Sequence, residues 1–255
     1  MIKRQDLVKY LDELFNVPTT PDVSYNGLQF EGAERVRTVV TGVDATGEFF
    51  RQAAAAGGQF AIVHHGLFWK GREWRRIDRF ARATVTALAA ADLSLYALHL
   101  PLDGHPELGN NARLAQAIGA RLGAPFGDFL GQKVGYVGRF PRPLTVAAFR
   151  QRCEKAIGPL LVHLDHGPAR ISAVGIVSGG GWDTVTDQLV ESGELQAVLT
   201  GEAIHQAVAL CRDRRVHLFA FGHYATETFG VKALGDHLAA KFGLVHRFID
   251  VPTGL

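Results

Sequence analysis

The chain has 255 residues, enough for one large domain or two smaller ones with a substantial core. Hydrophobic residues make up 47% and charged residues 20%, which is ordinary for a globular protein outside a membrane. The formal net charge is only +2, so bulk electrostatics give no reason to expect a nucleic-acid or membrane surface.

The first fifteen residues and the cysteines indicate the cellular compartment of the protein. The segment "MIKRQDLVKYLDELF" predicts an amphipathic helix with charges throughout, which is not typical of a signal peptide. No uncharged apolar run approaches the length of a membrane span. Cys153 and Cys211 have no metal-binding or redox spacing, so we expect buried thiols in a reducing compartment. Together these features predict a cytoplasmic protein.

Short β-branched and apolar runs alternate with helical patterns along the chain, which predicts the α/β fold class. The predicted strands are residues 36–43, 59–63, 94–98, 133–140, 171–177, 195–200, 215–221 and 243–249. The predicted helices are residues 4–15, 46–56, 77–91, 109–119, 145–157, 183–192, 203–213 and 226–241. Strands that alternate with helices in this way are typical of parallel sheets.

Two stretches of the chain follow the same order of elements and suggest two related halves. "TGVDATGEFFRQAAAAGGQFAIVHHG" and "VSGGGWDTVTDQLVESGELQAVLTGE" both run from a strand through a loop and a helix to a strand with a polar end. Gly and Pro cluster over residues 121–132, which favours a boundary near residue 125. The last predicted strand and helix carry polar residues like those of the first half. We therefore expect one α/β domain from 1–125 with 216–255, and a second, similar one from 126–215.

Four predicted strands end in side chains that are able to bind metal ions or to act as acids. These side chains are Asp44; His64 and His65; His99 and Asp103; and His223 and Glu227. Ligands of open α/β sheets bind in the crevice outside the carboxyl ends of parallel strands, so we expect these side chains to gather there. Imidazoles combined with carboxylates suit Zn, Mn or Fe(II), and a carboxylate is able to bridge two ions.

Glycines beside the histidines are part of this prediction. His64 and His65 are adjacent, so inside a strand they would point to opposite faces. Gly66 follows them and would let the backbone turn so that both rings enter one space. Glu227 would lie in the first turn of the helix after His223, where the helix dipole favours a carboxylate.

Several residues around the predicted site have more than one interpretation. His99 would be a ligand, or a base that holds a ligand or a water molecule. We favour Asp44 as a supporting or turn-forming residue over a direct ligand. Asn110 and Asn111 are most simply a helix cap. The remaining histidines of the strands and helices are expected to be hydrogen-bonded core or surface residues; they are His163, His166, His217, His237 and His246.

Two segments are candidates for contact with a substrate. The glycines of "VSGGGWDTV" would cradle an anion with backbone N–H groups or form a tight turn. Glu202 and His205 would contact substrate or cap a helix.

The same segments resemble the NGG-interacting-factor-three-like proteins, which are described as dinuclear metal-centre hexameric proteins and often labelled GTP cyclohydrolase 1 type 2 homologs. The resemblance is carried by "IVHHGLFWKG", "HLPLDGHPELGNNARLAQAIG" and "GHYATETFGVKALGDHL". Weaker matches such as "YNGLQFEG" and "LTGEAIHQA" extend it over nearly the whole chain in order. One departure is Tyr25, because many relatives carry an acidic residue immediately before the Asn-Gly-Leu segment.

The resemblance implies a ligand set, a fold and an assembly. The metal ligands would be His64, His65, Asp103, His223 and Glu227, and they would hold two divalent ions per chain, of Zn, Fe or Mn. The α/β domains would be similar and intertwined, with the metal site at the carboxyl ends of strands in the crevice between them. The resemblance also implies a ring-shaped homohexamer whose metal sites face an internal cavity.

The predicted site and the resemblance favour a metal-dependent hydrolase whose two ions hold a bridging water. If the family label applies, hydroxide would attack the imidazole carbon of a purine nucleotide such as GTP, and His99 would transfer protons. Residues 70–76 or residues 179–181 would bind the phosphates. One alternative is phosphoester hydrolysis at the same centre. The other is a non-enzymatic, hexameric scaffold that binds metal.

Overall fold

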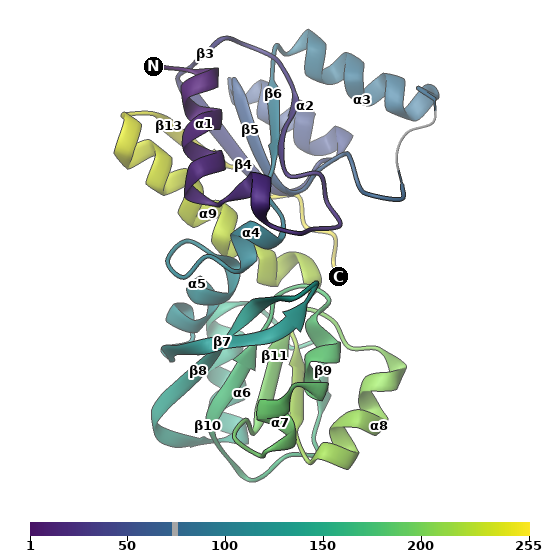
Figure 1. Ribbon diagram of the computed structural model, residues 1–255, viewed down its shortest axis with the longest axis vertical. Coiled ribbons are helices and arrows are strands. Elements are labelled where there is room, and N and C mark those ends of the chain that lie inside the picture. Colours follow the sequence, from purple (N-terminus) through teal and green to yellow (C-terminus); the bar gives the residue numbers. More distant parts are fainter. Residues whose placement is uncertain (73–75) are drawn as a thin grey trace. The chain divides into compact units, whose positions relative to one another are not determined.

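The structure is a computed structural model that describes residues 1–72 and 76–255. The described chain forms two compact units (Figure 1). Unit 1 comprises Met1–Leu102 with Gly230–Val251, and unit 2 comprises Asp103–Phe229 with Pro252–Leu255. Each unit contains a β-sheet with helices, so the predicted α/β class is confirmed. Residues 73–75 of the predicted basic segment 70–76 lie outside the described residues.

The sheet of unit 1 runs in the order β13-β4-β5-β6-β2. These strands are β13 (Val245–Phe248), β4 (Thr38–Asp44), β5 (Phe60–His65), β6 (Ser94–Ala97) and β2 (Gly27–Phe30). All neighbours pair in parallel except β2, which is antiparallel to β6. A short antiparallel ribbon of β1 (Ile2–Lys3) and β3 (Arg35–Val36) accompanies the sheet. Because β4, β5 and β6 are parallel, their carboxyl ends at Asp44, His65 and Ala97 lie side by side.

Helices cover both faces of the sheet in unit 1 (Figure 1). They are α1 (Arg4–Leu14), α2 (Gly47–Ala55), α3 (Arg79–Ala90) and the part of α9 (His223–Phe242) from Gly230 onward, with a 3₁₀ turn η1 (Val17–Thr19) after α1. Phe50 of α2 and Leu88 of α3 pack on the face that carries Val40 and Ala61. Burial on both faces explains why β5 begins with the unbroken apolar run from Phe60 to Val63.

The other face of this sheet is held by hydrogen-bonded histidines. The hydroxyl of Thr41 lies 2.9 Å from Nε2 of His246 in β13, and the His246 ring lies against Gly235 of α9. Tyr10 of α1 hydrogen-bonds His237 of α9 at 2.5 Å. These two histidines are hydrogen-bonded packing residues, as predicted.

The sheet of unit 2 runs in the order β7-β8-β10-β11-β12-β9. Its strands are β7 (Arg121–Phe129), β8 (Gln132–Thr145), β10 (Arg170–Ile176), β11 (Ala197–Thr200), β12 (His217–Ala220) and β9 (Val162–Leu164). β10, β11 and β12 are parallel, and the outer strands are antiparallel to their neighbours. The core contains Phe149, Ile176, Leu199 and Phe219.

The remaining helices are mostly in unit 2. They are α5 (Asn110–Ala117), α6 (Val146–Ala156), α7 (Gln188–Glu191), α8 (His205–Arg214), the 3₁₀ helix η2 (Gly181–Thr186), and the short turn α4 (Leu100–Asp103) at the junction of the units. The helix predicted over 183–192 is thus a 3₁₀ helix followed by a single α-turn. None of the described helices combines the length and the apolar composition that crossing a membrane requires.

The structure differs from the sequence prediction at both expected domain boundaries. The Gly- and Pro-rich segment 121–132 is not a boundary and lies within unit 2, where β7 pairs with β8 through a tight turn in which Leu130 and Gly131 have positive φ. Pro125 fits there because β7 is an edge strand. The segment 216–229, expected with the first half, lies in unit 2, because β12 pairs with β11 and β9.

Candidate metal centre

Three histidines gather at the carboxyl ends of neighbouring strands in unit 1. His64 and His65 end β5, and His99 follows β6. One ring nitrogen from each lies within 4.8 Å of the others, and neighbouring ring centroids are 4.8 to 5.7 Å apart. His64 is fully buried. We call these three residues the histidine group.

Each ring of the histidine group is held at Nδ1 by an oxygen that only accepts hydrogen bonds. The pairs are His64 with the Leu98 carbonyl at 3.0 Å, His65 with Asp44 Oδ1 at 2.8 Å, and His99 with Asp22 Oδ1 at 2.8 Å. The ring proton therefore sits on Nδ1, and Nε2 carries the lone pair. Metal-binding histidines are supported from behind in this way, so the group fits a divalent ion.

The support of His99 is extensive and was not predicted from the sequence. The buried carboxylate of Asp22 also accepts hydrogen bonds from the backbone N–H groups of Ser24 and Leu100 and from Asn26 Nδ2. Burial alone would raise the pKa of Asp22, but its hydrogen bonds and the charge interaction with His99 lower it to about 2. Asn26 also accepts a bond of 2.7 Å from the His99 backbone N–H. Asp22 could have been found in the sequence as the nearest acidic residue before the Asn-Gly-Leu segment.

Gly66 is required for packing next to the histidine group. A Cβ atom at this position would lie 2.5 Å from Ala97 Cβ and 2.5 Å from Gln29 Nε2. Trp69 donates its indole N–H to the Gly66 carbonyl at 2.9 Å, and its ring lies edge-on to His99 at 5.1 Å. The glycine thus lets the chain after β5 pass close to β6, with Trp69 as an aromatic wall beside the imidazoles.

In unit 2, His223 and Glu227 lie one turn apart at the start of α9. Nε2 of His223 is 3.0 Å from Glu227 Oε1, and its Nδ1 is 2.7 Å from Glu202 Oε1. Burial opposes charge on this imidazole, but the two carboxylates outweigh it and raise the pKa of His223 to about 9. Glu202, predicted as a substrate contact or a cap, therefore supports His223 from behind. We call His223 and Glu227, together with the predicted ligand Asp103 of the same unit, the acidic group.

Asp103 is held by a network that includes both asparagines of the LGNNARL segment. Its Oδ1 accepts from Asn110 Nδ2 at 2.8 Å and from Ser178 Oγ at 3.0 Å. Asn111 accepts from the Ser178 backbone N–H at 2.7 Å. The interpretation of the two asparagines as a helix cap is wrong, because Gly109 occupies the cap position of α5.

The glycine run after β10 packs against the acidic group. Gly179 has a φ of +61°, and an added Cβ would collide with Glu227 Oε1 and lie 3.0 Å from His223 Nε2. Its N–H donates to Thr226 Oγ1 at 3.0 Å, and its carbonyl accepts from Thr200 Oγ1 at 3.1 Å. Gly179 thus allows a close approach to the carboxylate, and its N–H group is already used within the fold.

Gly179→Ala is therefore expected to displace Glu227 and to lower the metal content of the purified protein severalfold. The strained φ adds a stability cost of about 1–2 kcal/mol. Elemental analysis measures the first effect and urea unfolding the second. Gly180→Ala is the matched control, because a Cβ there meets nothing within 4 Å. Equal metal content in the two variants would contradict this role of Gly179.

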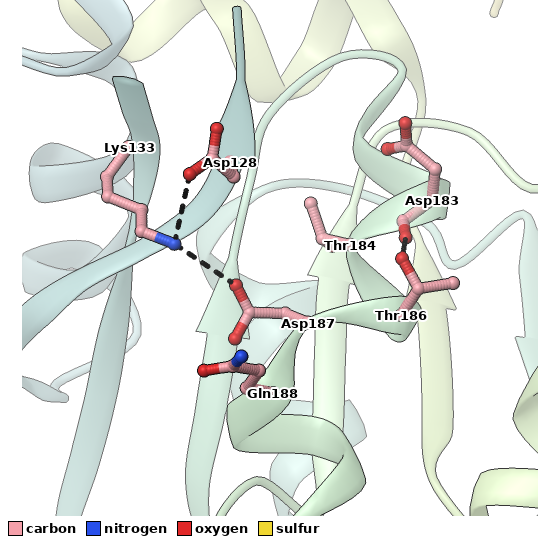
Figure 2. Close-up of a pocket in the computed structure, with 7 residues that line it drawn as sticks. All are labelled: Asp128, Lys133, Asp183, Thr184, Thr186, Asp187 and Gln188. Carbon is pink, nitrogen blue, oxygen red and sulfur yellow. Dashed lines mark hydrogen bonds and ion pairs between the residues drawn. The ribbon is translucent and has the colours of Figure 1, made fainter. Parts of the chain in front are cut away.

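A hollow of about 440 Å³ lies beside η2 in unit 2 (Figure 2). It is lined by Asp128, Lys133, Asp183, Thr184, Thr186, Asp187 and Gln188. Nζ of Lys133 lies 3.4 Å from Asp128 Oδ2 and 3.7 Å from Asp187 Oδ2, so its charge is already balanced (Figure 2). Three carboxylates against one ammonium group disfavour a phosphate here.

The four strand ends that we expected at the carboxyl end of a single sheet belong to two different units. Asp44, the paired histidines and His99 follow strands of unit 1, whereas His223 follows β12 in the sheet of unit 2. The expectation of a single sheet edge is wrong, because β12 pairs with β11. The five predicted ligands and His99 remain predictions, now in two groups.

The fold and these groups define an α/β protein whose imidazoles and carboxylates are arranged so that they could hold metal ions. The Duf34/NIF3 (NGG1p interacting factor 3) family matches residues 2–253, and the chain belongs to this family. The resemblance inferred from the sequence is confirmed.

Relatives match over the full length of the chain. A GTP cyclohydrolase 1 type 2 homolog of Pyrococcus horikoshii is 39% identical over 99% of both chains. One of Deinococcus radiodurans is 38% identical over 100% of this chain and 95% of its own. Among solved structures, the protein ybgI, described as of unknown function, has a TM-score of 0.90 at 35% identity, and TTHA1606 of Thermus thermophilus has 0.87 at 38%; both alignments cover 100% of each chain.

Proposed function

We propose that this chain is a metal-dependent hydrolase that binds two divalent ions, of Zn, Fe or Mn, through the predicted ligands His64, His65, Asp103, His223 and Glu227. The observation that carries the proposal is the support behind the imidazoles. His64, His65 and His223 each place Nδ1 against a carbonyl or carboxylate oxygen, as metal-binding histidines do. That both groups serve the same pair of ions follows from the family resemblance.

His99 is suited to move protons in such a reaction. A pair of divalent ions activates water at neutral pH and polarises the substrate. Asp22 holds Nδ1–H of His99 at 2.8 Å, which fixes the ring and stabilises the imidazolium that forms when Nε2 takes a proton. We therefore assign His99 the role of general acid and base.

The substrate that we propose is a purine nucleotide such as GTP, opened at the imidazole carbon of the base. The names of the relatives from Pyrococcus horikoshii and Deinococcus radiodurans support this choice. Trp69 lies 5.1 Å from His99 and 5.8 Å from His65, centroid to centroid, and would offer an aromatic surface to a base.

The proposal also covers the cellular location and the oligomeric state of the protein. We propose a cytoplasmic homohexamer, as the family resemblance implies. Cys153 and Cys211 are buried free thiols, which fits a reducing compartment.

Metal removal tests this function directly. We expect the purified chain to carry about two ions and to release formate from GTP, and a chelator to abolish the release until metal is restored. The assay compares GTP with a panel of phosphoesters. Phosphate release without formate would select the phosphoester hydrolase instead. A fully loaded protein that acts on none of these compounds would overturn the hydrolase and leave the metal-binding scaffold.

A further inference from the structure

A second cluster of metal-capable side chains lies in unit 2, at the edge of its sheet. His163 lies in the edge strand β9 and pairs opposite Phe219 of β12. Residues two apart on a strand share a face, so His217 lies on the same face as Phe219. The His163 ring stacks on Phe219 with centroids 4.2 Å apart. Continuing the register places Asp165 opposite His217. We call His163, Asp165 and His217 the edge cluster.

The ligand atoms of the edge cluster are close enough to share one ion. A ring nitrogen of each histidine and an Asp165 carboxylate oxygen lie within 4.8 Å of one another. Nε2 of His217 lies 2.9 Å from the Pro168 carbonyl, so this nitrogen carries a proton. Nδ1 of the same ring lies 3.1 Å from Asp165 Oδ1. A lone pair and a carboxylate oxygen repel at this distance unless a proton or a metal ion lies between them.

Two contacts favour a metal ion over a proton. The backbone N–H of Gly167 lies 3.3 Å from Nδ1 of His217, so that nitrogen carries no proton; an ion bound there would take over the lone pair from this long hydrogen bond. Nε2 of His163 is buried and has no hydrogen-bond partner in the part of the chain that the structure describes. Burying a ring nitrogen without a partner is costly, and coordination would remove that cost.

We propose that the edge cluster binds a zinc ion. Two imidazoles and one carboxylate, with a fourth position for water, are a common zinc ligand set. The Asp165 side chain is 69% exposed and the His217 side chain 1%, so an ion would enter from solvent and be held on the buried side. Pro168 supports His217 from behind. The ion would cross-link β9 and the loop after it to β12.

This site is distinct from the acidic group. His217 begins β12 and His223 follows its end, so the length of the strand separates them. The edge cluster does not depend on the proposed hydrolase.

The test uses the full chain with His64→Ala and Glu227→Ala, which removes predicted ligands of the other site. We expect this chain to bind one zinc ion in competition with a chromogenic chelator, and the ion to raise its Tm. Adding Asp165→Asn and His163→Ala should weaken that binding by about tenfold or more and remove the Tm shift. His217→Ala is avoided because its buried ring packs in the fold.

A second measurement keeps the two sites distinguishable. In the chain with all other ligands intact, Asp165→Asn with His163→Ala should lower the saturated zinc content by one ion and leave any GTP hydrolysis unchanged. Asp213→Asn, at an exposed aspartate of α8, is the control and should change neither. Equal zinc content and equal Tm shifts with and without the edge substitutions would overturn the proposal, whatever the state of the proposed hydrolase.

Discussion

Replacing His64 and Glu227 by alanine is expected to leave the purified chain without tightly bound metal at the predicted centre. Both side chains are buried, His64 in the histidine group and Glu227 in the acidic group. Removing a ligand from each group leaves neither with a full set, so we expect the metal content to fall by about two ions per chain. Elemental analysis after gel filtration measures this loss.

Two control variants accompany the double substitution. Glu227→Gln keeps the shape of the side chain and removes only its charge, so its loss of metal would not reflect a cavity. His205→Ala removes an exposed histidine and should keep the full metal content. Circular dichroism establishes that each variant is folded. A folded double variant that keeps all its metal would refute the assignment of these ligands.

Asp22→Ala is expected to lower the free energy of unfolding by about 3–5 kcal/mol. The Asp22 side chain is 1% exposed and accepts hydrogen bonds from Ser24, Asn26, His99 and Leu100. Without it, these donors would be buried without their acceptor, and the His99 ring would lose the partner that orients it. Urea unfolding of the metal-free chain measures the change without a contribution from bound ions.

Asp44→Ala is the matched control for this prediction. Asp44 also accepts from a histidine of the same group, but its side chain is 29% exposed and water is able to replace the bond. We expect a cost of about 1 kcal/mol there. Equal urea midpoints for Asp22→Ala and Asp44→Ala would contradict the stabilising role that we assign to Asp22.

Much of the fold was predictable because the sequence patterns are strong locally. The apolar runs of β4 and β5 are buried on both faces, as in most parallel sheets, and such runs stand out in a sequence. The paired histidines at the end of β5 stood out for the opposite reason, because an apolar strand seldom ends in two imidazoles. The prediction of His64 and His65 as metal ligands came from that contrast.

What the sequence did not predict depends on contacts between distant segments. β7 contains Gly and Pro and resembles a linker, and only its pairing with β8 makes it a strand. Asp22 lies in a loop without periodicity, and its importance comes from four donors, of which two lie in its own loop and two belong to the distant segment after β6. The membership of β12 in the second sheet depends on its partners β11 and β9, and the strand itself carries no sign of it.

The path of the chain through unit 1 has a consequence for biosynthesis. β13, the last strand, pairs with β4 near the beginning, whereas unit 2 is nearly continuous from Asp103 to Phe229. A ribosome therefore finishes almost all of unit 2 before it supplies the strand that completes the earlier sheet. A message truncated after codon 229 would yield a nascent protein in which β4 is an open edge, ready to pair with other chains and aggregate.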